Sequence, residues 1–129
     1  MQPEGRVKVF VYGSLREGEA NAGLLKNAVK LGSECLHGGY TLYDLGPYPA
    51  AVASSKGGQL WGEVYQINEC TLRALDWLEV YPVEYDRVEV DTSYGKAWIY
   101  LYNHSVDGLP VIVNGDWCQR GGTVSSSFL

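Results

Sequence analysis

The sequence predicts an α+β fold built on a curled or barrel-like mixed sheet. Short apolar segments rich in β-branched and aromatic residues recur along the chain, and two stretches between them have helical periodicity. Five strands and two helices in mixed order, with hairpin-like spacing later in the chain, are typical of this class. The 129 residues suffice for one domain with a single core. We expect that domain to span 1–129, with a flexible tail from about residue 119.

The first predicted strand is the centre of the chain's organisation. In the stretch 7–16, VKVFVYGSLR, an apolar run with strand character ends abruptly at Gly13 and Ser14. The uninterrupted run is typical of a strand buried on both faces. Glycine lets the backbone bend, and such a turn can direct several backbone N–H groups at one spot, which makes it a candidate anion cradle. An ordinary turn at the end of a strand is the alternative.

The elements that follow are predicted from periodicity and from turn residues. Ala20–Lys30 has an apolar stripe at helical spacing, so we expect a helix there. Gly39–Leu45 alternates as a second strand, and the Gly/Pro-rich segment 46–50 is expected to end it in a turn. After a flexible link at 54–58, Gln59–Ile67 alternates as a third strand.

A second helix is predicted from an N-cap at Asn68 to a stop at Pro82. Three leucines form its apolar stripe, and Glu79 falls between them near the helix C-terminus. A carboxylate in this position is costly without a purpose or a partner, because burial penalises its charged form. The alternative is that Glu79 lies beyond the last regular turn, in water or paired with an arginine.

The rest of the chain predicts a hairpin and a C-terminal plug. Segments 83–92 and 96–102 alternate on either side of a Tyr94–Gly95 turn, as antiparallel strands do. Region 103–113 contains another turn and is a candidate for the start of a short helix. We expect Trp117 to fill an edge of the core.

Composition excludes several functional classes. The net charge is −5 without any basic run, so a nucleic-acid partner is not expected. Three widely spaced cysteines and two isolated histidines lack metal-ligand spacing, so we expect reduced thiols and no metal. No apolar stretch approaches the roughly 18 residues of a membrane span, and no signal-peptide core is present. We therefore expect a cytoplasmic protein without a membrane partner.

Five motifs taken together resemble the γ-glutamylcyclotransferase-like superfamily, and are similar to its small bacterial and plant branch and to the γ-glutamylamine cyclotransferases. In order they are YGSLREGEAN (12–21), LYDLGPYPA (42–50), GEVYQI (62–67), LDWLEVYPVEYDR (75–87) and GDW (115–117). The resemblance implies a small mixed β-barrel flanked by helices. It also implies a cofactor-independent enzyme whose partner is a small-molecule γ-glutamyl substrate, which it converts to 5-oxoproline and a free amine or amino acid.

The resemblance also implies which residues act. The acid/base glutamate of the family maps onto Glu79, the residue that the helical pattern places among leucines, with Glu84 as the substitute. The next position is commonly glycine in this family but is Val80 here, which is expected to tighten the exit from the helix. The substrate-binding cradle maps onto the backbone N–H groups of Tyr12, Gly13, Ser14 and Leu15.

Three further residues near the predicted site have more than one interpretation. Tyr85 is expected to line the pocket through its hydroxyl, with a core tyrosine as the alternative. Arg87 is expected to pair with a carboxylate structurally, and Asp76 is a candidate partner on the helix surface.

Two other functions remain open at this stage. One is a non-catalytic module that binds a small γ-glutamyl or related acidic metabolite. The other is an enzyme of the same fold with a different acyl-amine substrate. The oligomeric state is not predicted.

Overall fold

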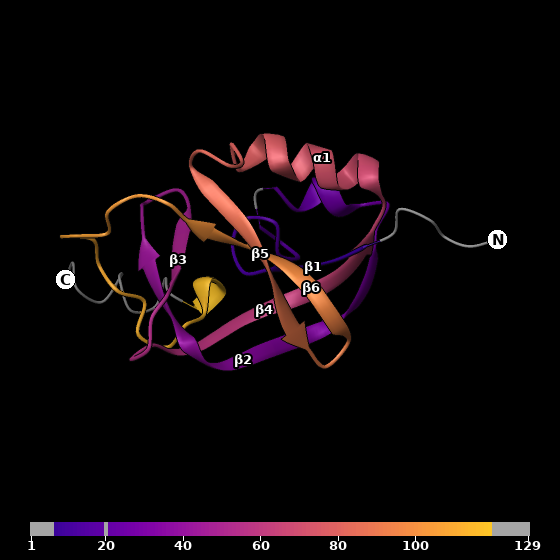
Figure 1. The fold of residues 1–129 in the computed structure, drawn as a ribbon. Coiled ribbons are helices and arrows are strands. Elements are labelled where there is room, and N and C mark those ends of the chain that lie inside the picture. The colour runs from indigo at the N-terminus through magenta and orange to yellow at the C-terminus, as the bar shows by residue number, and fades with distance from the viewer. Residues whose placement is uncertain (1–6, 20, 120–129) are drawn as a thin grey trace.

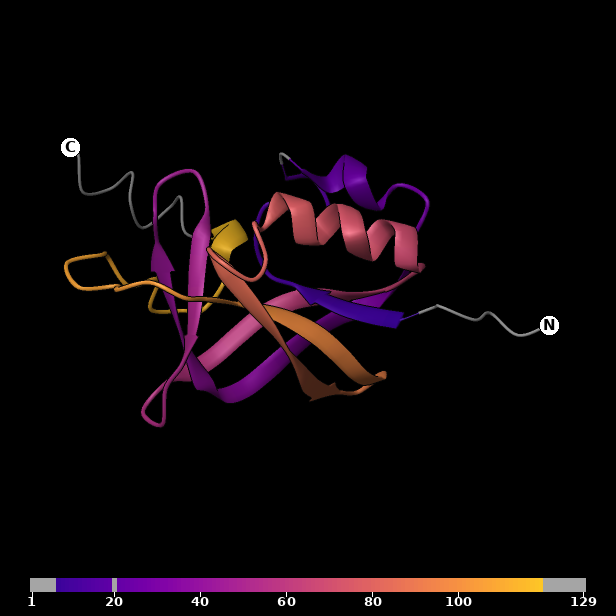
Figure 2. The same ribbon diagram turned by 45° about the horizontal axis from the view of Figure 1, so that its top comes forward.

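The computed structural model describes residues 7–19 and 21–119, which form one curled six-stranded sheet with an α-helix packed against it (Figures 1 and 2). The strands are β1 (Val7–Val11), β2 (Val29–Asp44), β3 (Pro49–Ala53), β4 (Gly58–Ile67), β5 (Tyr85–Thr92) and β6 (Gly95–Tyr102). The helices are α1 (Glu69–Leu78) and the short 3-10 turns η1 (Ala22–Leu25) and η2 (Trp117–Gln119). The strand order is β3-β2-β4-β1-β6-β5, with β1 and β6 parallel and all other neighbours antiparallel. The predicted α+β class with a mixed, barrel-like sheet is confirmed.

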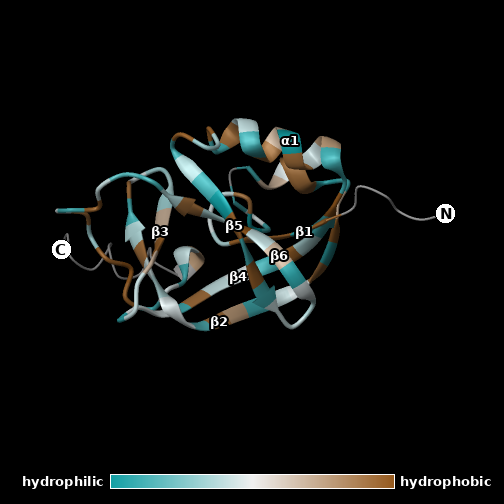
Figure 3. Ribbon diagram, viewed as in Figure 1, coloured by the Kyte–Doolittle hydropathy of each residue, from teal (hydrophilic) through white to brown (hydrophobic). Residues whose placement is uncertain are grey.

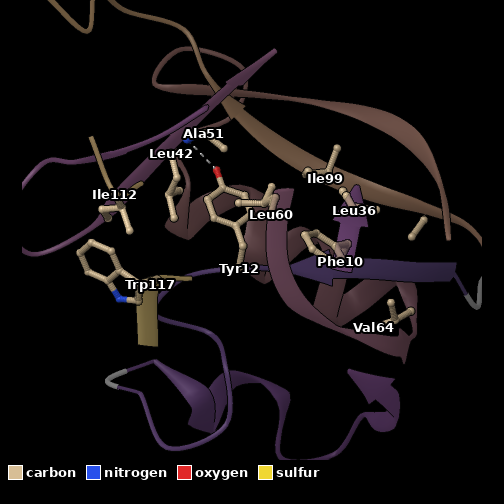
Figure 4. Close-up of a cluster of buried hydrophobic side chains, with 11 residues drawn as sticks. Phe10, Tyr12, Leu36, Leu42, Ala51, Leu60, Val64, Ile99, Ile112 and Trp117 are labelled. Carbon is tan, nitrogen blue, oxygen red and sulfur yellow. Dashed lines mark hydrogen bonds between the residues drawn. The ribbon is translucent and has the colours of Figure 1, made fainter. Parts of the chain in front are cut away.

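Strand β1 is buried on both faces, as its apolar run predicts. Successive side chains of a strand point to opposite faces, so Phe10 joins one hydrophobic cluster while Val9 and Val11 join another. Figure 4 shows the first cluster, which includes Phe10, Leu42, Leu60, Val64, Ile99 and Trp117. The second lies between the sheet and α1 (Figure 3) and includes Leu15, Leu25, Ile67, Leu75 and Tyr85. The turn after β1 therefore emerges where the two clusters meet.

Three elements lie where the sequence places them. The strand predicted at Gln59–Ile67 is β4, which begins one residue earlier. Asn68 caps α1, because its Oδ1 accepts a hydrogen bond from the backbone N–H of Thr71 at 2.8 Å. The predicted hairpin is β5 and β6, with Thr92 opposite Gly95.

The helix predicted at Ala20–Lys30 is wrong. Within its described part only the four residues of η1 are helical, and β2 already begins at Val29. Val29 and Lys30 pair with Gln66 and Tyr65 of β4, so sheet pairing outweighs the local helical pattern. Register shifts between residues 30 and 32 and between 36 and 40 interrupt the alternation of β2, and the sequence therefore predicts only its last part as a strand.

A sixth strand is missing from the sequence prediction. The segment 46–50 was expected to be a turn, but its last two residues begin β3, which runs antiparallel to β2 with Leu42 opposite Ala51. Proline is tolerated at the first position of an edge strand, and Pro49 occupies that position here. This short strand forms one wall of the pocket described below.

Two long-range contacts hold the curled sheet together. The tip of the β5–β6 hairpin contacts β2, where Glu34 accepts a hydrogen bond from the backbone N–H of Ser93 at 2.9 Å. Near the C-terminus, the backbone N–H of Ile112 donates to the carbonyl of Leu42 at 2.8 Å. Trp117 then lies in the core with 1% of its surface exposed, which confirms the predicted plug.

Other expectations for the C-terminal part differ in outcome. Region 103–113 contains turns and no helix. The tail was predicted from about residue 119, but Gln119 belongs to η2. The rest of the predicted tail lies outside the described residues. In the described ranges, no helix has the length and apolar character needed to cross a membrane.

Candidate functional site

A pocket of about 400 Å³ opens at the C-terminal end of β1. Its walls come from five parts of the chain: residues 10–15, the segment 45–49 that leads into β3, the end of α1 with the loop after it, the first residue of β5, and β6. Most lining side chains are apolar or aromatic, and two, Glu79 and Glu84, are carboxylates. No lysine, arginine or histidine is among the described residues that line it.

Glu79 is the C-cap residue of α1 and lines this pocket. The helix ends in a Schellman arrangement. In it the backbone N–H of Tyr81 donates to the carbonyl of Asp76 at 2.9 Å, and that of Val80 donates to the carbonyl of Trp77 at 3.2 Å. Val80 has a φ of 52°, the left-handed conformation that glycine normally supplies at this position. The chain therefore ends α1 with a valine in the backbone conformation that glycine usually adopts after a helix.

The Glu79 carboxyl group is partly buried, and burial raises its pKa from 4.5 to about 7. Tyr12 and Tyr85 lie close enough for the charge of Glu79 to raise their own pKa values, although burial is the larger cause for both. Within the described ranges, no hydrogen bond or ion pair to the Glu79 side chain occurs. The group is thus half protonated near neutral pH, where an acid/base catalyst is most effective.

The turn after β1 lines the pocket with residues whose backbone N–H groups have no described acceptor. Gly13, Ser14 and Leu15 line it, and their N–H groups donate to no described residue. Gly13 lies against Pro49, whose ring would overlap a Cβ at this position. Buried N–H groups without a protein acceptor are suited to hold an anionic group.

The hydrogen bonds of Ser14 do not include a general base that could activate its hydroxyl as a nucleophile. Its Oγ accepts a hydrogen bond from Nδ2 of Asn21 at 2.8 Å, and its carbonyl accepts one from the Asn21 backbone at 2.7 Å. No described histidine, lysine or carboxylate contacts the hydroxyl. The serine therefore shapes the turn.

An ionic cluster that the sequence analysis missed anchors the same turn. Arg16 Nε donates to buried Glu63 at 3.2 Å, and its Nη1 donates to Asp116 at 2.7 Å. Glu63 also accepts hydrogen bonds from the Glu17 backbone at 2.9 Å and from the Tyr65 hydroxyl at 3.0 Å. The only sequence signal is a carboxylate inside the apolar third strand, and its partner lies 47 positions away.

Two tyrosines tie the pocket walls together. The Tyr12 hydroxyl donates to the carbonyl of Tyr100 at 2.5 Å and accepts from the backbone N–H of Ala51 at 3.3 Å (Figure 4). Tyr85 lies in the pocket wall, where its hydroxyl donates to the carbonyl of Pro49 at 2.7 Å. These bonds connect the turn after β1 with β3, β5 and β6 around the cavity.

Of the remaining predicted residues, Glu84 lies in the pocket lining, whereas Asp76 and Arg87 lie outside it. Glu84 lines the pocket, with 3.3 Å between its carboxylate and Nε2 of His104. Asp76 and Arg87 form an ion pair outside the pocket lining. Among the residues that the structure describes, no group of three or more His, Cys, Asp or Glu side chains could hold a metal ion.

The arrangement places a proton acceptor with a near-neutral pKa in the same pocket as residues with unpaired backbone N–H donors. Such a pair of features can bind a substrate carboxylate or oxyanion and move a proton beside it.

Comparisons with known proteins agree with this architecture. Residues 9–119 match the family model described as gamma-glutamyl cyclotransferase, AIG2-like. The gamma-glutamylcyclotransferase family protein YtfP of Escherichia coli (strain K12) is 45% identical over 114 residues, which cover 88% of this chain and 98% of that protein. A solution NMR structure of ytfP from Escherichia coli superimposes with a TM-score of 0.73 at 44% identity, covering 89% of this chain and 99% of that one.

A more distant structure has the same fold. The crystal structure of the uncharacterized protein PH0828 from Pyrococcus horikoshii gives a TM-score of 0.80 at 32% identity and covers 93% of this chain and 97% of that one. The family model and the relatives span nearly all of the described chain, the pocket included. The chain belongs to the gamma-glutamylcyclotransferase (AIG2-like) family.

Proposed function

We propose that the protein is a γ-glutamylcyclotransferase that releases an amine from a γ-glutamyl amide and forms 5-oxoproline. The observation that carries this proposal is Glu79, a carboxyl group of near-neutral pKa in a pocket that is also lined by residues with unpaired backbone N–H groups. The family relationship supports the reaction class.

In the proposed reaction the α-amino nitrogen of the γ-glutamyl group attacks its own γ-carbonyl carbon. A ring C–N bond forms and the original amide C–N bond breaks. Glu79 takes the proton from the attacking nitrogen and gives it to the leaving nitrogen, so no water or co-reactant is consumed. Because both reacting groups belong to one molecule, holding the chain curled supplies much of the rate.

The cradle of Gly13, Ser14 and Leu15 is proposed to hold the negative charge of the substrate. Its N–H groups can bind the α-carboxylate or the oxyanion that develops on the γ-carbonyl. A backbone cradle fits a pocket whose described lining includes no cationic side chain. Tyr85 is proposed to shape the wall against which the substrate curls.

The mouth of the pocket favours γ-glutamyl amines over γ-glutamyl amino acids. Tyr48 and Val80 line it with 48% and 50% of their surfaces exposed, and Glu84 is the nearby charge. An amino-acid leaving group would bring its own carboxylate toward Glu84. The described lining holds no cation to offset this repulsion, because His104, which contacts Glu84, lies outside it. An amine with an apolar body would meet Tyr48 and Val80 instead.

The test is 5-oxoproline release from a matched panel of γ-glutamyl amines and γ-glutamyl amino acids. We expect release to depend on Glu79, with Glu79→Gln losing on the order of 10²-fold or more of the rate. Glu84→Gln removes the other pocket carboxylate and is the matched control, expected to retain most activity toward the γ-glutamyl amines. The pH profile of kcat/KM should rise through a pKa near 7, the value for Glu79.

The panel also separates the proposal from the binding-module alternative. Binding of a γ-glutamyl amide, measured by calorimetry, without 5-oxoproline release from any member would contradict catalysis and support a binding module. Equal rates for amines and for amino acids of the same size would contradict the proposed leaving-group preference alone.

A further inference from the structure

We propose that Arg87, Asp76 and Tyr100 form a positioning cluster that fixes the end of α1 and thereby holds Glu79 at the substrate. The inference rests on the proposed function, because it assigns these residues a role through Glu79. None of the three is a catalytic residue in this proposal. The cluster acts through the backbone on either side of the carboxylate.

The contacts within the cluster are short and directional. Arg87 Nε donates to Oδ1 of Asp76 at 2.8 Å, and Nη2 donates to Oδ2 at 3.1 Å. The Tyr100 hydroxyl donates to the same Oδ1 at 2.6 Å. The Asp76 carboxylate is therefore held by two residues from the β5–β6 hairpin.

Arg87 also contacts two aromatic rings, that of Tyr81, which follows Glu79 in the chain, and that of Trp98 in β6. Its guanidinium carbon lies 4.6 Å from the ring centre of Tyr81 and 4.5 Å from that of Trp98. Asp76 precedes Glu79 by three residues and Tyr81 follows it by two, and the Tyr81 N–H bonds to the Asp76 carbonyl. One arginine thus holds both flanks of the segment that carries Glu79.

The partial burial of the pair distinguishes it from an ordinary surface ion pair. The Arg87 and Asp76 side chains are 16% and 19% exposed. By contrast, the Arg73–Glu69 pair on the same helix spans 4.0 Å and has 71% and 65% exposed side chains. Bidentate, partly desolvated pairs constrain geometry, whereas exposed pairs contribute little.

Tyr100 connects the cluster to the opposite wall of the site. Its side-chain hydroxyl binds Asp76, while its backbone carbonyl accepts the Tyr12 hydroxyl from the start of the cradle turn. The helix end that carries Glu79 and the cradle turn are therefore both connected by hydrogen bonds to Tyr100 of β6. This gives a physical route by which the cluster fixes their separation.

The kinetic test compares Arg87→Met with Arg73→Met, which removes an exposed arginine of α1, the helix that carries Asp76. We expect Arg87→Met to lower kcat about tenfold or more with KM changed less than about threefold, and Arg87→Lys to restore part of the loss. Arg73→Met should change neither constant. Unchanged kcat in Arg87→Met would overturn the proposal.

A double-variant cycle shows whether Arg87 acts through Glu79. In the Glu79→Gln background, Arg87→Met should lower the remaining rate by less than about twofold, because the group that it positions is already gone. The same fractional loss in both backgrounds would mean a general structural effect and would overturn the positioning role.

Amide hydrogen exchange tests the geometry without any substrate. In Arg87→Met the amides of Glu79, Val80 and Tyr81, which close the helix end, should exchange at least about tenfold faster. The Leu72 amide in the first turn should not change, and Arg73→Met should leave all four unchanged. Undiminished protection at the helix end would overturn the inference, whereas absent 5-oxoproline release with faster exchange would contradict only the proposed function.

Discussion

Replacing Glu79 with glutamine is expected to stabilise the folded protein at neutral and alkaline pH. The carboxyl group has a pKa of about 7 in the folded state and 4.5 as a model group, because folding buries it. The folded protein therefore binds more protons between these two values, and wild-type stability falls as the pH rises from about 4.5 to about 7. Glutamine has the same shape and carries no charge at any pH.

The size of the effect follows from the pKa change. One pKa unit corresponds to about 1.4 kcal/mol, so the free energy of unfolding of Glu79→Gln should exceed that of wild type by up to about 3 kcal/mol above pH 7. The difference should vanish near pH 4.5, where the wild-type carboxyl group is protonated in the folded state. The variant would thus be more stable and less active, the pattern of a strained catalytic group.

Urea unfolding followed by circular dichroism from pH 4 to pH 9 measures this difference. Glu89→Gln, which removes an exposed carboxylate of β5, is the matched control and should follow the wild-type curve within about 0.5 kcal/mol. A constant difference between Glu79→Gln and wild type across the pH range would refute the assignment of a buried, near-neutral Glu79.

Three further predictions concern the backbone of the site. Val80→Gly should raise the free energy of unfolding by about 1 kcal/mol, because it relieves the left-handed conformation. Val80→Ala keeps a Cβ and should raise the free energy of unfolding by less. Equal effects of the two variants in thermal unfolding would contradict this reason. Gly13→Ala should destabilise the protein by about 1–3 kcal/mol through overlap with Pro49 and should reduce activity. Gly23→Ala serves as the control, because the space around Gly23 is open. Equal effects of the two variants in urea unfolding would contradict the close packing of Gly13 against Pro49. Ser14→Ala should lower kcat/KM only a few-fold, since its hydroxyl bonds Asn21, and loss of all activity would point to a nucleophile instead.

The predictable parts of the fold are those whose local signals agree with their tertiary pairing. The apolar run of β1, the Asn68 cap and the β5–β6 hairpin each have a pattern contained within one element. Strand β2 could not be predicted in full, because its bulges break the alternation and its N-terminal residues have a helical pattern. The structure of these N-terminal residues is decided by pairing with β4, since Val29 and Lys30 lie opposite Gln66 and Tyr65 at the far end of that strand.

The candidate site likewise has a part that the sequence indicates and a part that it does not. Glu79 is marked in the sequence because a carboxylate lies at an apolar position of a helix. The contacts that shape the cavity are not marked, since Tyr12 bonds to Tyr100 across 88 positions and Arg16 bonds to Asp116 across 100. Neither pair has a local pattern, so only the folded chain shows that they meet.

The pocket has two ends with different tolerance for change. The reacting end is built from buried backbone and from side chains bonded across the sheet, such as Tyr12 and Tyr85. The mouth is built from exposed residues of connecting segments, such as Tyr48 and Val80. Substitutions at the mouth are therefore expected to cost little stability. Under the proposed function, they can alter which amine is accepted while the residues behind them stay unchanged. A fold of this design can diversify its substrates while its chemistry stays constant.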